Sequence, residues 1–243
     1  MLKIDRLVKQ YPPETKVLNG ISMEVHHGEF IGVVGASGSG KTTLLKCLAL
    51  QESWTSGSYY VDGNDVIKQN ALLKHKVKRE FAYLEQNPVL SPNRKAFKNV
   101  LIGRSSQTPL WRMATGMVRN DDYMGAMDTL ELLGLLDKAK VQTGQLSGGE
   151  KQRVAIARAL VHGAKVILAD EPVLGLDPHA AEDVMRNFQS VCQKERCTVI
   201  AVFHQVELAE RFCTRIIGLA DGDIKLDIHG RKLLQSEKRM LQL

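Results

Sequence analysis

The stretch "GASGSGKT", Gly35 to Thr42, has residue types and a spacing that can hold a phosphate. It fits G-x-x-x-x-G-K-[ST], and it stands between the apolar "FIGVVG" and "KTTLLKCLAL", which is helical in length and composition. Glycines let a backbone wrap a phosphate without Cβ clashes, and a helix N-terminus adds positive potential. Lys41 is therefore expected at the β- and γ-phosphates of a nucleotide, and the Thr42 hydroxyl on Mg²⁺. The expected nucleotide contacts are Gly35, Ala36, Ser37, Gly38, Ser39, Gly40, Lys41, Thr42 and Thr43.

Two acids end a second apolar stretch, "VILADEP", which runs from Val166 to Pro172. Asp170 is predicted to hold Mg²⁺, often through water, at the carboxyl end of a buried strand. Glu171 is then placed to polarise an attacking water. A lone Asp-Glu pair at a strand end is as often structural as it is functional. Here its position behind a phosphate loop favours the catalytic interpretation.

Three further residues fit the same site by their types. His204 ends the apolar "TVIAVFH" and is predicted to hydrogen-bond the γ-phosphate from the same sheet edge, although a lone histidine is more often a packed or surface residue. Gln86 ends "FAYLEQ", and its amide could ligate Mg²⁺ or its water. Tyr11, in the turn "KQYPPETKVL", could stack on a purine; the alternative is a tyrosine that only covers a loop.

A second helix start suited to phosphate is "LSGGE", where Ser147, Gly148, Gly149 and Glu150 offer a hydroxyl and bare N–H groups at a positive dipole end. Because the first loop already wraps its own nucleotide, a head-to-tail dimer is the economical arrangement. Each chain would then present Ser147 to the γ-phosphate bound by the other. Ser147 and Glu150 also have the spacing of a capping box, in which the Glu150 carboxylate folds back to the Ser147 N–H.

The pattern of elements predicts an α/β fold. Alternating residues in "ISMEV" and short turns indicate an antiparallel edge near the N-terminus, whereas "KVILAD", "CTVIAVFH" and "RIIGLADGDIKL" are apolar strands separated by helical stretches. From about Asn87 to Leu146 the spacing is helical. We therefore expect a single domain over residues 1–243, with a largely parallel, helix-covered sheet, an antiparallel β subdomain and a helical subdomain inserted at about 87–160.

Composition limits the classes of protein. The 243 residues carry a net charge of +6, with the positive residues scattered, and no apolar run approaches the ~20 residues that span a bilayer. The charged N-terminus does not resemble a signal peptide, so we expect the chain in the cytosol. The 4 cysteines have no metal-type spacing and are expected to be reduced and mostly buried. The basic "KHKVKR" and the amphipathic C-terminal tail are expected to be a solvated helix face and a packing helix, with a partner or lipid contact as the alternative for each.

Taken together, these motifs resemble the ATP-binding subunits of ABC transporters over essentially the whole chain. "GASGSGKT" resembles the Walker A loop, "VILADE" the Walker B strand, "LSGGE" the signature and "GLDP" the D-loop, while Gln86, His204 and Tyr11 resemble the Q-loop, H-loop and A-loop residues. The resemblance implies a P-loop ATPase that uses ATP and Mg²⁺, with Glu171 as catalytic base and Asp177 aligning a dimer interface. It also implies permease partners on the cytoplasmic face of the membrane, contacted by the helical insertion and the loop after Gln86.

A finer resemblance is to the phosphonate-import ATPases, through "NVLIGR", "PLWRMATG", "AKVILADEPVLGLDP" and "HQVELAERFCTRIIGLADGDI". It implies uptake of phosphonate or a related phosphorus oxyanion with a periplasmic binding protein, and no nucleic-acid partner. Two departures stand out: Glu150 replaces the usual Gln of the signature, and Leu174-Gly175 stand where Ala-Ser is frequent. The motifs "LSGGE" and "GASGSGKT" also resemble those of lipoprotein-release and macrolide-efflux ATPases, so an exporter is the alternative.

Two other classes fit less well. Soluble ABC ATPases of DNA repair carry long coiled-coil insertions and ribosomal ones carry two cassettes, whereas this sequence has one cassette and no room for a coiled coil. A non-catalytic ATP sensor is disfavoured because Lys41, Asp170, Glu171 and His204 are all present.

Overall fold

The computed structural model describes residues 1–13, 15–66, 71–103 and 120–242, without the side chains of 71–73, 75, 76 and 120. Its main sheet is largely parallel. Within the described residues, its strand order is β10-β9-β3-β8-β7-β6, and only β10 runs antiparallel to its neighbour. The bounds are β3 Phe30–Val34, β6 Phe81–Leu84, β7 Val166–Asp170, β8 Thr198–Phe203, β9 Arg215–Ala220 and β10 Asp223–His229.

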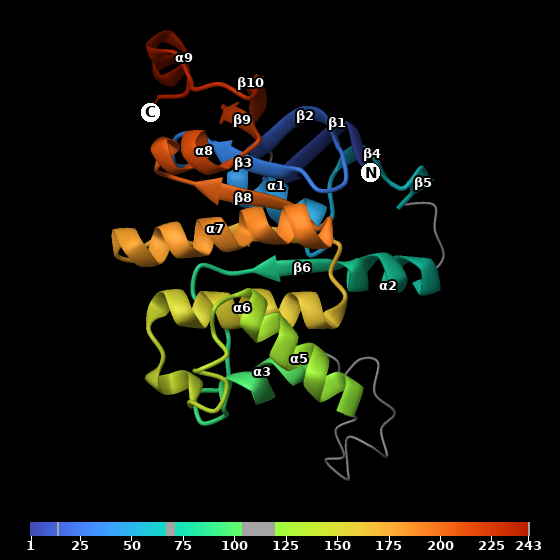
Figure 1. Cartoon of the computed structure of the whole chain (residues 1–243). Coiled ribbons are helices and arrows are strands. Elements are labelled where there is room, and N and C mark those ends of the chain that lie inside the picture. The colour runs from blue at the N-terminus through green and yellow to red at the C-terminus, as the bar shows by residue number, and fades with distance from the viewer. Residues whose placement is uncertain (14, 67–70, 104–119, 243) are drawn as a thin grey trace.

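The central strands are apolar throughout because helices or a second sheet cover both of their faces. Every residue of β3, β8 and β9 is buried. One face packs on α1 (Lys41–Leu48) and the N-terminal strands, and the other on α7 (Pro178–Glu195) and α8 (Val206–Phe212). Figure 1 shows these layers, with α7 crossing the middle of the view.

The N-terminal strands form the expected antiparallel sheet, in the order β2-β1-β4-β5. Its bounds are β1 Leu2–Tyr11, β2 Thr15–Val25, β4 Ser56–Val61 and β5 Asn64–Asp65. The Asp-Gly pair between β4 and β5 turns the chain with φ of 48° at Asp62 and 79° at Gly63, the left-handed values that a tight hairpin needs. The prediction of an antiparallel edge joined by short turns is confirmed.

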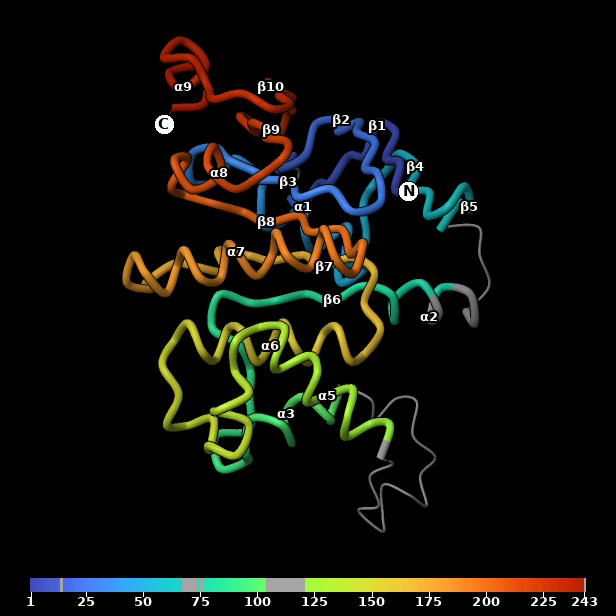
Figure 2. Tube along the Cα trace, viewed as in Figure 1, coloured from blue at the N-terminus to red at the C-terminus, as the bar shows by residue number. Residues whose placement is uncertain are grey.

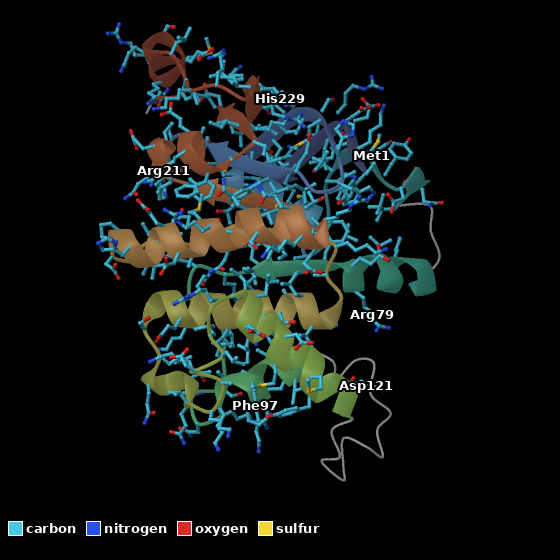
Figure 3. The ribbon with its side chains drawn as sticks, in the orientation of Figure 1. Met1, Arg79, Phe97, Asp121, Arg211 and His229 are labelled. Atoms are coloured by element: carbon cyan, nitrogen blue, oxygen red, sulfur yellow. The ribbon has the colours of Figure 1, made fainter. Side chains whose placement is uncertain are left out.

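A group of helices lies beyond β6, at the opposite end of the molecule from the N-terminal sheet (Figures 1 and 2). It contains α3 (Ala96–Ile102), α5 (Asn120–Leu132) and α6 (Gly148–His162), with a short helical turn, η2, at Thr143–Gln145. Figure 3 labels Phe97 and Asp121 in this group and His229 at the far end. The stretch "PLWRMATG" lies outside the described residues.

Two basic segments are helical. The run "KHKVKR" lies in α2 (Ala71–Glu80), and the C-terminal tail forms α9 (Gln235–Met240). Leu241, directly after α9, is fully buried. Its side chain packs closely on Gly218 of β9, where an added Cβ would lie only 2.6 Å from it. The tail is therefore packed onto the sheet through Leu241.

The cysteines are unpaired thiols. Cys47, Cys192 and Cys197 are buried and Cys213 is half-buried. Burial raises the pKa of Cys47 to about 11 and those of Cys192 and Cys197 to about 12, so these thiols are protonated at neutral pH. Within the described part of the chain, no helix is both long and apolar enough to cross a membrane.

Candidate functional site

Four strands bring the candidate residues to one edge of the main sheet. In the parallel register Val34 lies opposite Phe203, Asp170 opposite Val202, and Leu84 opposite Ala169. The carboxyl ends of β3, β8, β7 and β6 therefore meet, which is where open α/β sheets bind ligands. The phosphate-type loop follows β3, His204 follows β8, the two acids end β7, and Gln86 follows β6 as an exposed residue.

The loop between β3 and α1 needs its glycines for close backbone approach. A Cβ at Gly35 would stand 2.0 Å from the carbonyl oxygen of Leu219. Gly40, the N-cap of α1, has φ 101°, and a Cβ there would stand 2.8 Å from the Val17 oxygen. The loop's path thus depends on residues without side chains.

Lys41 is held inside this loop. It is 6% exposed, and its ammonium donates to the carbonyl oxygens of Gly35 at 2.8 Å and Ala36 at 2.7 Å. Burial lowers the pKa of Lys41, and the charges of Glu171 and Asp170 oppose that shift. Because an ammonium has three donors, one remains for a phosphate oxygen.

A buried hydroxyl in the same loop points to a missing ligand. Ser39 is 6% exposed, and its Oγ has no hydrogen-bond partner among the described residues. Native proteins rarely leave a buried polar atom unsatisfied, because its desolvation is not repaid. An anion with several acceptor oxygens, seated on the loop, would satisfy it.

Asp170 is held from both sides by hydroxyl groups. Thr42 Oγ1 donates to its Oδ1 at 3.1 Å, and Tyr83 OH donates to its Oδ2 at 2.9 Å. Burial raises the pKa of the Tyr83 phenol, and the Asp170 charge adds to the rise, so the phenol is a donor at neutral pH. Tyr83 is a residue that the sequence analysis missed; only the pairing of β6 with β7 brings it to Asp170.

The side chains of Glu171 and His204 are in contact. The Glu171 Oε1 lies 2.6 Å from His204 Nε2, and the glutamate side chain is 19% exposed. Glu171 has a left-handed backbone, φ 51°, which is unusual for a residue with a side chain and marks local strain. Glu171 is the first residue after β7, so this left-handed conformation lies where the chain leaves the strand.

Tyr11 ends β1 and is fixed from two directions. Its hydroxyl donates to the Glu52 carboxylate, and the Lys9 ammonium lies 4.5 Å from the centre of its ring. Lys9 is itself tied to the Ser53 carbonyl oxygen at 2.6 Å. The hydrogen bond to Glu52 raises the pKa of Tyr11. Lys9 and Glu52 were not singled out from the sequence, which gives no sign of this contact.

The capping box predicted at the start of α6 is confirmed. The Ser147 N–H donates to Glu150 Oε2 at 2.8 Å, and the Glu150 N–H donates to Ser147 Oγ at 3.2 Å. Lys138 lies 3.8 Å from the other Glu150 oxygen and offsets its charge. The Glu150 carboxylate is thus folded back on its own helix.

The signature glycines also have a packing role that the sequence analysis missed. A Cβ at Gly148 would stand 2.8 Å from Leu176, and one at Gly149 would stand 2.9 Å from the Ala180 side chain. The start of α6 therefore lies against the start of α7. Asp177 is the N-cap of α7 and accepts the N–H groups of His179 and Ala180, so in the single chain it has a local structural role.

A phosphate loop, a strand-end carboxylate pair and a parallel sheet with this order define a P-loop NTPase. Residues 18–174 match the family described as ABC transporter, so the chain belongs to that family, as an ATP-binding cassette that hydrolyses ATP.

Curated relatives in this family have similar length. The chain is 40% identical over 225 residues, 92% of this chain and 86% of the relative, to the phosphonates import ATP-binding protein PhnC of Bdellovibrio bacteriovorus. It is 38% identical to PhnC 1 of Trichodesmium erythraeum, over 98% of this chain and 93% of the relative.

Among solved structures, the dimeric structure of MJ0796, a bacterial ABC transporter cassette, matches with a TM-score of 0.80. The sequences are 30% identical, and the match covers 96% of this chain and 100% of that one. A post-hydrolysis dimer of the same cassette, bound to ADP and Pi, has a TM-score of 0.80 and is 29% identical, with the same coverage. The expected fold class is confirmed.

Proposed function

We propose that the chain is the ATP-hydrolysing subunit of an importer for phosphonates or a related phosphorus oxyanion. The observation that carries the substrate class is the similarity to two phosphonates import proteins over more than nine-tenths of this chain. An ATPase subunit does not itself touch the cargo, so the site supports the hydrolysis and the relatives support the cargo.

In this proposal the triphosphate of ATP lies on residues 35–43, with Lys41 and Ser39 among its donors and Tyr11 against the purine. Thr42 and Asp170 fit Mg²⁺, because their hard oxygen atoms already lie 3.1 Å apart at a helix start. Gln86 is the third proposed ligand. The metal would supply charge neutralisation at the β- and γ-phosphates.

Glu171 is the proposed general base. It accepts a proton from the water that attacks the γ-phosphorus, while the bond to the β-phosphate oxygen breaks and ADP leaves. His204, already in contact with Glu171, holds that carboxylate and hydrogen-bonds the γ-phosphate. Lys41 stabilises the charge on the transferred group.

Two chains would form the complete site. In a head-to-tail dimer, Ser147, Gly148, Gly149 and Glu150 of one chain would face the γ-phosphate bound by the other, with Asp177 at the interface. The dimeric state of the similar MJ0796 cassette supports this arrangement. ATP stabilises closure because it adds contacts across the interface.

Permease subunits are the proposed membrane partners. Residues 87–160 are the proposed helical subdomain. A groove of about 280 Å³ runs between β6 and α6, lined by residues that include Phe81, Ile102, Ala155 and Arg158. It is a suitable seat for a permease segment at the cytoplasmic face of the membrane. A periplasmic binding protein would deliver the cargo.

A gene-deletion experiment tests the substrate class. The host without this gene would be grown with a phosphonate or with inorganic phosphate as sole phosphorus source. We expect the deletion strain to fail to grow on the phosphonate but to grow on inorganic phosphate. The wild-type gene and Glu195→Gln, an exposed carboxylate away from the site, should restore growth, whereas Glu171→Gln should not. Normal growth of the deletion strain on phosphonate would overturn the cargo assignment.

A further inference from the structure

Tyr83 reaches the candidate metal site by strand geometry. It lies in β6, opposite Leu168 of the parallel strand β7. Side chains two residues apart on a strand share a face, so Asp170 lies diagonally next to Tyr83, on the face that packs against α1. A tyrosine is long enough to place its hydroxyl on the carboxylate, and the OH to Oδ2 distance is 2.9 Å.

The two hydroxyl groups on Asp170 have different tasks. Thr42 binds Oδ1 and is itself a proposed metal ligand, whose oxygen keeps free lone pairs when its proton is donated. Tyr83 binds only Oδ2, and among the described residues its hydroxyl has no other hydrogen-bond partner. With both oxygen atoms engaged, the plane of the Asp170 carboxylate is fixed before nucleotide arrives. Rotation about its terminal bond, which is otherwise soft, is restrained.

We propose that Tyr83 is the positioning residue of the metal site: its hydroxyl holds the Asp170 carboxylate in the orientation that accepts the metal together with Thr42. The proposal rests on the proposed role of Asp170 and Thr42 as metal ligands. Partners of metal ligands contribute to affinity by fixing ligand orientation, and their loss typically weakens metal binding about 10- to 100-fold. Tyr83 itself touches neither nucleotide nor metal.

Tyr83→Phe removes one oxygen atom and keeps the ring. The matched control is Tyr59→Phe. The Tyr59 hydroxyl also donates to an acceptor inside the protein, but that acceptor is the Leu48 carbonyl oxygen and not Asp170. Asp170→Asn is the variant that removes the metal ligand's charge. All are compared with the wild type as full-length proteins.

The first measurement is ADP affinity in EDTA, which reports the phosphate loop without metal. The second is the affinity of the protein–ADP complex for Mn²⁺, measured by electron paramagnetic resonance of the free ion. We expect Tyr83→Phe to keep its ADP affinity within about twofold and to weaken Mn²⁺ binding about tenfold. Tyr59→Phe should change neither quantity, and Asp170→Asn should weaken Mn²⁺ binding most.

A third readout is the Mg²⁺ concentration that half-activates ATP hydrolysis. In Tyr83→Phe it should rise about tenfold, while kcat at saturating Mg²⁺ stays near the wild-type value. Unchanged Mn²⁺ affinity in Tyr83→Phe overturns the proposal. So does an equal loss of ADP affinity in EDTA, which would mean a general disturbance of the core. If Asp170→Asn binds Mn²⁺ like the wild type, the metal-ligand assignment itself fails, and the two failures are distinguished.

Discussion

The Glu171 carboxylate lies 2.6 Å from Nε2 of His204. The backbone of Glu171 has a φ of 51°. A left-handed conformation at a non-glycine residue costs about 1–3 kcal/mol and persists when the surrounding structure enforces it. Here the flanking strands β7 and β8 supply that enforcement, because both are almost wholly buried. The geometry keeps the Glu171 carboxylate against the His204 imidazole.

Glu171→Gln is expected to lower kcat by about 10²- to 10⁴-fold, because an amide cannot accept the proton of the attacking water. ATP binding should persist, since the phosphate loop is unchanged. Phosphate release and size-exclusion chromatography with light scattering measure both effects, with Glu195→Gln as the matched control. The variant should form a dimer in ATP. Turnover at the wild-type rate would remove Glu171 from the mechanism.

Glu150→Gln is expected to change ATP-driven dimerisation by less than about threefold. The amide oxygen can still accept the Ser147 N–H, so the capping box survives. Glu150→Ala loses that bond, and the N-terminus of α6 should be destabilised by about 0.5–1 kcal/mol. Dimerisation of each variant in the Glu171→Gln background, as a function of ATP concentration, makes the comparison. A large gain in ATP affinity for Glu150→Gln would show that the carboxylate does repel the γ-phosphate.

The parts of the site that could be predicted are those encoded in short stretches. The loop from Gly35 to Thr42 is recognisable from its own glycines, lysine and threonine. Asp170 and Glu171 are recognisable as two acids at the end of an apolar strand. Ser147 and Glu150 are three residues apart, so the capping box needed only local geometry.

The parts that could not be predicted depend on which strands become neighbours. Tyr83 meets Asp170 only because β6 pairs with β7, although the two are separated by 81 residues between Leu84 and Val166. The same holds for Tyr11 with Glu52 and for Gly149 with Ala180. From the local sequence, Gly148 and Gly149 are predicted only to bind phosphate. Their close contact with the start of α7 leaves no periodic pattern in the sequence.

Glu52→Ala is expected to weaken ATP binding about threefold to tenfold, by releasing the Tyr11 hydroxyl and so loosening the ring that we propose to stack on the base. Inorganic triphosphate has no base, so its affinity should not change. Calorimetric titration of both ligands, with Tyr11→Ala in parallel, tests this, and Glu24→Ala offers a control on the outer face of β2. An equal loss for triphosphate would place Glu52 in the support of the phosphate loop instead.

Asp227→Asn is expected to destabilise the fold by about 1–2 kcal/mol at neutral pH, a value reduced for the solvent contact that Asp227 keeps. Arg215, whose side chain is 7% exposed, donates to Asp227 at 2.7 and 2.6 Å, and this bond lowers the pKa of Asp227 from its ordinary 3.8. Because the folded-state pKa is depressed, the stabilisation is complete well above pH 3.8. It is lost as pH falls below 3.8 through the folded value.

The difference in unfolding free energy between wild type and Asp227→Asn should therefore be constant from pH 7 to about 5 and shrink towards zero in stronger acid. Urea titrations at several pH values measure it, and Asp223→Asn, on an exposed pair with Lys225, is the matched control. A difference that stays constant down to pH 2, or that grows in acid, would show that the Asp227 charge does not stabilise Arg215. The carboxylate would then matter only for its shape.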